Sequence, residues 1–216
     1  MSHEDRNSAF QIAAEEGHLE IIAYLALQEN SDEDRRGLAV WEAAKTNRLE
    51  NVRSLLAFGS ISDRYRGWIV KDAVKEGHID IVKTLLASGA LISEKDRGGA
   101  VILASVKGHL EIVQLLLANG DKISEEDRGK AIEEAVWEGH LAVVEFYFDL
   151  WNFSENDKEQ AIKTASLRGH LDILQFFLAN AGSTSSKQKV INFALFIDGI
   201  PIKVKIFLAN FEKTLF

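Results

Sequence analysis

Cysteine is missing from the 216 residues of this chain, which excludes disulfide bonds, thiolate metal ligands and cysteine nucleophiles. A chain without cysteine fits a reducing compartment. Long apolar runs are missing too, since none approaches the roughly 20 residues of a membrane-spanning helix. The first residues, MSHEDRNSAF, lack the apolar core of a signal peptide. We therefore expect a soluble, cytoplasmic protein that has no membrane association.

An excess of positive charge is also lacking. The 25 Lys and Arg residues stand against 33 Asp and Glu residues, so the net charge is −8. This balance disfavours nucleic acids and anionic membranes as partners, because both attract basic surfaces. Apolar residues make up 46% of the chain and charged residues 27%, which is typical of a folded globular protein.

What the chain has instead is an internal repeat. The segments EEGHLEII, KEGHIDIV, VKGHLEIV, WEGHLAVV and LRGHLDIL recur, with glycines at Gly17, Gly77, Gly108, Gly139 and Gly169. Asn47 takes the place of the glycine in a degenerate copy, TNRLENV, and a seventh, eroded copy follows in VINFALFIDGIPIKVKIFLAN. Seven copies predict one repeat domain over 1–216, with units at about 2–30, 31–60, 61–91, 92–122, 123–152, 153–182 and 183–216.

Apolar residues follow helical spacing twice in each unit. Before the glycine of the fourth unit stand Ala100, Val101 and Ala104, and the small alanines predict a close approach between neighbouring helices. After the glycine, a second apolar pattern runs from Leu110 to Leu117. Each unit is therefore predicted to be a helix–turn–helix hairpin that buries its apolar faces against its neighbours, which gives an all-α solenoid.

The segments AVKEGHIDIVKTLLASGA and ASVKGHLEIVQLLLANGD resemble the second half of the ankyrin repeat, A-x-x-x-G-H-L-x-I-V-x-x-L-L-x-x-G-A. The resemblance covers all seven units. It implies an ankyrin-type fold that recognises a partner protein without catalysis or a cofactor. Two features depart from the family: the T-P-L-H motif is absent, and the units are shorter than the usual ~33 residues.

A charged segment, S-x-x-D-R-G, precedes the first helix of several units, as in ISEKDRG and ISEEDRG. Serine followed three residues later by an acid is close to a capping box, whereas the glycine alternatively marks a tight turn. Glu159 replaces the glycine in the sixth unit, and glutamate adopts a positive φ poorly. We therefore expect the first helix to begin at this segment, with the β-hairpin finger of ankyrin repeats reduced to a short link.

Five histidines follow the repeated glycines: His18, His78, His109, His140 and His170. Neighbouring units stack at about 8–10 Å, whereas metal ligands all lie about 2 Å from one ion. The histidines are therefore too far apart to share a metal, and we expect them to make local hydrogen bonds at the turn. No nucleophile elbow, phosphate-binding loop or HExxH motif occurs, so we predict neither catalytic nor metal-binding residues.

The resemblance to ankyrin repeats places partner contacts on a concave face, at the two residues before each Gly-His pair, and helical spacing extends that face backwards along the first helices. The predicted protein-binding residues are Leu38, Trp41, Lys45, Trp68, Lys71, Lys75, Ile102, Val106, Lys107, Glu133, Trp137, Glu138, Leu167 and Arg168. Trp68 and Trp137 either bind a partner, as tryptophan does at hot spots, or pack against the next unit. For Val106 and Leu167 packing is favoured.

The last unit is rich in apolar residues, although terminal repeats normally have a polar outer face. They include Phe193, Phe196, Ile206, Phe207, Phe211 and Phe216. This end either folds back as a cap or docks on another chain, so self-association through the C-terminal repeat stays open. The alternative functions are the targeting arm of an enzyme whose catalytic part lies outside this chain, and a structural homo-oligomer. The low-proline, finger-poor form points to a bacterial effector that acts on proteins in a host cytosol.

Overall fold

The computed structural model describes residues 3–18, 21, 24–25, 33–88, 93–118, 123–151 and 153–215. These residues contain 13 helices and no strand, which confirms the all-α prediction. The helices group into two compact units. The first comprises Met1–Ala104 and Glu111–Ser124, and the second comprises Ser105–Leu110 and Glu125–Phe216. The predicted single repeat domain over 1–216 stays a prediction.

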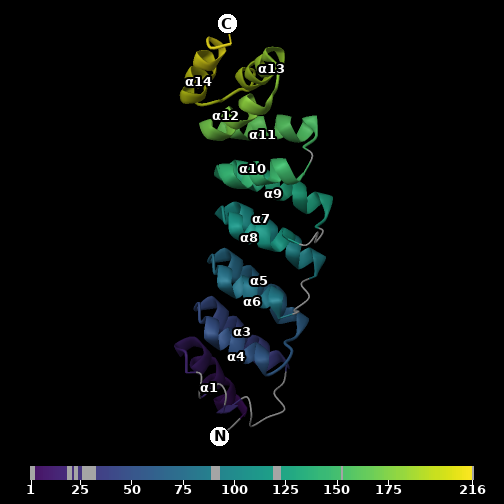
Figure 1. Cartoon of the computed structure of the whole chain (residues 1–216). Helices are drawn as coiled ribbons and strands as arrows, with labels where there is room; N and C mark the ends of the chain where they lie inside the picture. The colour runs from purple at the N-terminus through teal and green to yellow at the C-terminus, as the bar shows by residue number, and fades with distance from the viewer. Residues whose placement is uncertain are drawn as a thin grey trace. The chain divides into compact units, whose positions relative to one another are not determined.

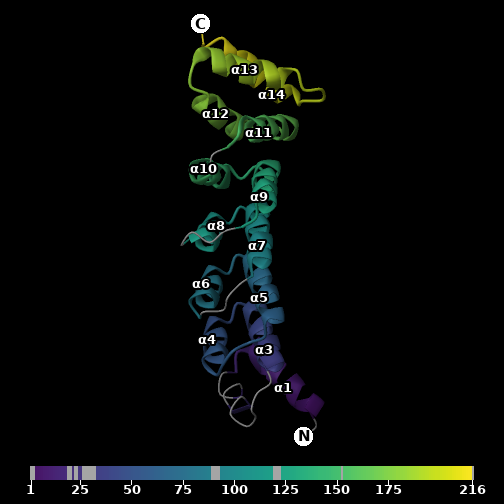
Figure 2. The same ribbon diagram turned by 90° about the vertical axis from the view of Figure 1, so that its right-hand side faces the viewer.

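The first unit stacks helix hairpins in two layers. One layer holds the first helices of the repeats and the other the second helices (Figures 1 and 2). The first helices are α1 (His3–Glu16), α3 (Glu33–Lys45), α5 (Asp63–Lys75) and most of α7 (Glu94–Lys107), and the second helices are α4 (Leu49–Ala57), α6 (Ile79–Ala87) and most of α8 (Leu110–Leu117). Helix α3 packs against α1, α4 and α5.

The second unit continues with the same kind of hairpin. Its helices are α9 (Glu125–Glu138), α10 (Leu141–Leu150), α11 (Glu155–Arg168), α12 (Leu171–Asn180), α13 (Thr184–Leu195) and α14 (Ile202–Glu212). Helix α11 packs against α9, α12 and α13, and α13 packs against α14. Pro201 is the N-cap residue of α14.

The charged segment forms the start of the first helix, as predicted. The Ser154 hydroxyl accepts the backbone N–H of Asp157, and the Asp157 carboxylate accepts the backbone N–H of Ser154, which completes a capping box before α11. The Ser93 hydroxyl accepts the backbone N–H of Asp96 in the same way. The alternative of a tight turn is wrong, because Gly129 lies inside α9 and is not among the residues of positive φ.

The repeated glycine before histidine has the left-handed backbone conformation. The φ angles of Gly77, Gly108, Gly139 and Gly169 are 73°, 68°, 83° and 77°, and Asn47 reaches 57° in the degenerate copy. A side chain with a Cβ is strained there, and asparagine tolerates the conformation better than most residues. These positions end each first helix and turn the chain into the second.

The core follows the two apolar patterns of the repeat. Ala100, Ala104, Ala131 and Ala135 are fully buried, so the first helices approach closely, as expected. The second helices bury two to four apolar residues each, such as Ile112, Val113 and Leu116 in α8. Apolar burial of this kind stabilises the fold by about 25 cal/mol per Å².

The links that replace the ankyrin finger are short where the structure describes them. Residues 58–62 join α4 to α5, and residues 181–183 join α12 to α13, and neither link contains a strand. The shortened finger is therefore confirmed for these two links. The links that include residues 26–32, 89–92 and 119–122 lie largely outside the described residues.

Candidate functional site

An aromatic cluster lies on the first helices of the first unit. The ring centroid of Trp68 lies 6.1 Å from that of Trp41, and Tyr65 meets Trp68 edge-on at 5.5 Å. The Trp41 indole N–H donates to the Asp72 carboxylate on the next first helix. Tyr65 is buried and Trp41 is half-buried, whereas Trp68 is 44% exposed. We call Trp41, Tyr65, Trp68 and the cation Arg64 the first-unit cluster.

Cations lie against the rings of this cluster. The Arg64 guanidinium is 4.9 Å from the Trp68 centroid and 5.2 Å from that of Tyr65. The Lys45 ammonium lies 5.6 Å from the Trp41 centroid and 3.8 Å from the Glu42 carboxylate. Such cation–π contacts contribute about 0.5–1 kcal/mol each at exposed sites. They hold the tryptophan in place and leave part of its ring accessible.

The other predicted residues of the first unit are less available to a partner. The Lys71 ammonium lies 3.2 Å from the carboxylate of Asp96 on the next first helix. The Ser93 hydroxyl and then Lys71 lower the pKa of Asp96, while burial opposes them. Lys75 is exposed and lies 3.4 Å from the Glu76 carboxylate. Leu38 and Ile102 are half-buried, so much of their surface already packs within the repeat.

A second aromatic site lies on the first helices of the second unit. Trp137, on α9, is 44% exposed, and the Arg168 guanidinium from α11 lies 4.4 Å from its ring centroid. The Arg168 Nε–H also donates to the Trp137 carbonyl at 3.2 Å. Leu167 is 40% exposed rather than packed as expected, and Glu133 and Glu138 are exposed beside Trp137. We call Glu133, Trp137, Glu138, Leu167 and Arg168 the second-unit site.

The remaining two predicted residues, Val106 and Lys107, lie at the end of α7 and belong to the second unit. Lys107 is exposed, and Val106 is half-buried, in agreement with the packing expected for it. The Val106 carbonyl accepts a hydrogen bond from the His140 ring at 3.0 Å. This backbone position therefore holds neighbouring repeats together.

Three of the five histidines make long-range hydrogen bonds instead of the local ones that we expected. His78, His140 and His170 each reach the end of the preceding repeat's first helix and donate to the carbonyls of Ala44, Val106 and Trp137 at 3.0, 3.0 and 2.9 Å. The final carbonyls of a helix lack partners inside it, and they lie at the negative end of its dipole. The prediction was wrong because a carbonyl more than 30 residues away comes within reach only when the repeats stack.

Sequence reasoning missed Arg64 and Tyr65. Arg64 precedes Trp68 by four residues, a spacing that brings two side chains to the same side of a helix. Their segment, DRYRGW, therefore contained the signal for a cation beside Trp68. Their contribution was overlooked because the charged segment was interpreted as a helix start alone.

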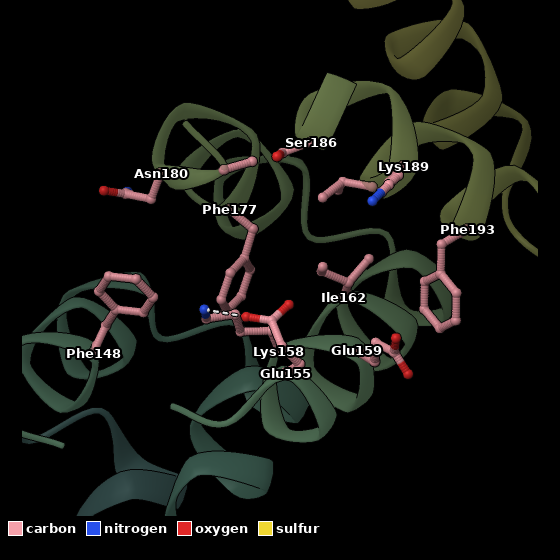
Figure 3. Close-up of a pocket in the computed structure, with 12 residues that line it drawn as sticks. Phe148, Glu155, Lys158, Glu159, Ile162, Phe177, Asn180, Ser186, Lys189 and Phe193 are labelled. Carbon is pink, nitrogen blue, oxygen red and sulfur yellow. Dashed lines mark hydrogen bonds and ion pairs between the residues drawn. The ribbon is translucent and has the colours of Figure 1, made fainter. Parts of the chain in front are cut away.

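A cavity of about 300 Å³ in the second unit was also missed (Figure 3). Phe148 from α10, Ile162 from α11, Phe177 from α12 and Phe193 from α13 supply its apolar walls. The ion pair between Lys158 and Glu155, at 2.7 Å, lies at its rim. Because the walls come from four helices, no local sequence pattern marks this cavity.

The described residues hold no group of three or more His, Asp or Glu side chains placed to bind a metal ion. Among the same residues, no helix is both long and apolar enough to cross a membrane.

Comparison with known families identifies part of the chain. Residues 70–150 match the family described as "Ankyrin repeats (3 copies)". This stretch runs from α5 to the end of α10 and includes Trp137. No curated protein matches the chain.

Proposed function

We propose that this chain, of which residues 70–150 match ankyrin repeats, binds a partner protein through the exposed faces of its first helices. Ankyrin repeats are generally protein-interaction modules rather than catalysts. The proposal places the partner's contacts on the first-unit cluster and on the second-unit site.

The observation that supports this proposal is the exposure of Trp68 and Trp137. Each of these residues keeps 44% of its surface accessible, whereas Tyr65 beside Trp68 is buried. Each ring also lies against a guanidinium, which limits the rotamer freedom that binding would otherwise remove. Rigid, accessible tryptophans are enriched among the residues that dominate binding energy.

The charges around the two tryptophans favour different parts of a partner. Arg64 and Lys45 lie against the rings of the first-unit cluster, so this surface favours an acidic segment. In the second-unit site the two carboxylates of Glu133 and Glu138 outnumber the one guanidinium of Arg168, so that surface favours a basic or cationic segment. Electrostatic complementarity of this kind sets register and specificity more than raw affinity.

The proposal is tested by measuring the affinity of an identified partner protein for the Trp68→Ala and Trp137→Ala variants. We expect at least one of them to weaken binding about tenfold or more, as loss of a hot spot does, while the helical circular dichroism stays unchanged. Leu150→Ala is the matched control, because Leu150 is similarly exposed but lies on a second helix. If neither tryptophan variant changes the affinity more than Leu150→Ala does, the first-helix faces are not the binding surface.

A further inference from the structure

We propose that the outward face of α14 in one copy of the protein binds the face of α9 that carries Trp137 in a second copy. This inference rests in part on the proposed function, because it assigns an occupant to the second-unit site. Its physical basis is a match of apolar surface and opposite charge between the two helices.

The outward face of α14 is apolar where solvent-facing helices are normally polar. Val204 and Leu208 are fully buried and face the core of the second unit. Ile202 and Ile206 lie one turn apart on the opposite side of the helix and are 71% and 56% exposed. Phe196, at the end of the neighbouring α13, is 90% exposed. A cap that met solvent alone would not require three large apolar side chains there.

Lysines accompany these isoleucines along α14, and the side chain of one of them, Lys203, reaches over Gly169 at the end of α11. Lys203, Lys205 and Lys213 are exposed, and within the described part of the chain none of them forms an ion pair. Residues 183–216 hold five Lys against one Asp and one Glu, whereas residues 1–182 hold 20 Lys and Arg against 31 Asp and Glu. The last hairpin is therefore a basic surface on an otherwise acidic chain.

Helix α9 has the complementary, acidic composition. Its sequence, EEDRGKAIEEAVWE, contains six acidic and two basic residues. Glu133 and Glu138 are exposed on either side of Trp137, and neither forms an ion pair among the described residues. Trp137 supplies apolar surface for Ile202 and Ile206, while the two carboxylates face the lysines.

The two faces do not meet within one copy. Helices α11 and α12 lie between α9 and α14 in the second unit, in both views (Figures 1 and 2). The contact therefore joins two copies through different surfaces, and such a heterologous contact leaves a free α14 and a free α9 at the ends of any assembly that does not close into a ring or a reciprocal dimer. Assembly then grows with protein concentration.

A second copy is favoured over an anionic membrane as the occupant. The lysines and isoleucines of α14 have the chemistry of a membrane-surface helix, but the net charge of −8 repels an anionic bilayer. The same acidic character supplies the complementary surface on a second copy.

The test is sedimentation velocity of the full chain at about 5 and about 200 µM, a range that brackets a weak association. We expect the mean mass to rise with concentration in low salt and to fall towards the monomer at about 0.5 M salt. The double variants K203E/K205E and E133K/E138K should each stay monomeric under these conditions. Lys95→Glu, on α7, is the control for charge reversal elsewhere and should assemble like the wild type.

Two further samples identify the interface. An equimolar mixture of K203E/K205E and E133K/E138K should assemble, because the intact α14 meets the intact α9 and the two reversed faces also carry opposite charges. The chain that carries all four reversals should assemble again, since the charges are exchanged and still opposite. A wild type that is monomeric throughout overturns the proposal, as does an E133K/E138K variant that assembles normally.

Vesicles that contain about 30% phosphatidylserine serve as the competing occupant. Binding to them without self-association assigns α14 to membranes and overturns the proposal. This outcome is separable from failure of the proposed function, because Trp68→Ala tests partner binding on the first unit and leaves both α9 and α14 intact.

Discussion

The imidazole of His140 lies directly over Gly108 of the preceding repeat. A Cβ added to Gly108 would lie 2.5 Å from the Nδ1 atom of His140, while Nε2 of the same ring donates to the Val106 carbonyl. His170 stands over Gly139 in the same way, where an added Cβ would lie 2.6 Å from its ring. The glycine of one repeat and the histidine of the next repeat therefore form a single contact between neighbouring repeats.

Gly108→Ala is expected to lower the free energy of unfolding by about 2 kcal/mol or more. The backbone φ of 68° strains alanine by about 1 kcal/mol, and the new methyl group displaces the His140 ring from its carbonyl partner, which costs about another 1 kcal/mol. Urea unfolding followed by circular dichroism measures the change.

The control for this substitution is Gly129→Ala. Gly129 lies inside α9 and an added Cβ there meets nothing within 4 Å, so alanine is expected to stabilise the protein by about 0.5–1 kcal/mol. Equal effects at the two positions would show that the contact between Gly108 and His140 is not the cause.

Ser105→Ala is expected to destabilise the protein by about 1–3 kcal/mol. The Ser105 hydroxyl is hydrogen-bonded to the buried Tyr147 hydroxyl at 2.6 Å, and its loss leaves the phenol group without this partner. Tyr147→Phe added to Ser105→Ala should restore part of the stability, because it removes the unsatisfied hydroxyl. A double variant less stable than Ser105→Ala would contradict this account.

Stability is expected to fall at alkaline pH through Tyr147. Burial raises the pKa of Tyr147 above its usual range, and the hydrogen bond with Ser105 partly opposes this shift. Since the folded-state pKa is raised, the contribution of the neutral phenol is complete below about pH 10, where an unfolded tyrosine ionises, and is lost as the pH rises further. Between about pH 10 and 11 the loss is about 1 kcal/mol.

Tyr147→Phe separates this effect from the titration of other groups. Urea unfolding at about pH 8, 10 and 11 should show a shallower decline for the variant than for the wild type, because the variant lacks the ionising phenol. Parallel declines would show that Tyr147 does not contribute.

The cap and turn chemistry was predictable because it is local. Ser154 and Asp157 lie three residues apart, so the capping box of α11 follows from the spacing alone. Asn47 adopts the conformation of the glycines that it replaces. The contacts of His140, by contrast, involve a carbonyl in the preceding repeat, and its distance depends on how closely the helices stack.

The candidate site, too, was predictable from the sequence only in part. The resemblance to ankyrin repeats placed Trp137, and helical spacing placed Trp68, on the outer side of first helices, but neither separated exposure from packing. The structure shows both to be partly accessible and shows Leu167 exposed where packing was expected. The position of Arg168 over the Trp137 ring joins side chains 31 residues apart, which no period within one helix specifies.

The residues of a single repeat specify its two helices, their starts and the left-handed turn between them. These features depend on apolar periodicity, caps and backbone conformation, all of which act over a few residues. The tertiary structure decided which side chains of neighbouring repeats meet: His140 with Gly108, Ser105 with Tyr147 and Arg168 with Trp137. Such contacts depend on packing distances between repeats, and a side-chain pattern within one repeat carries no information about them.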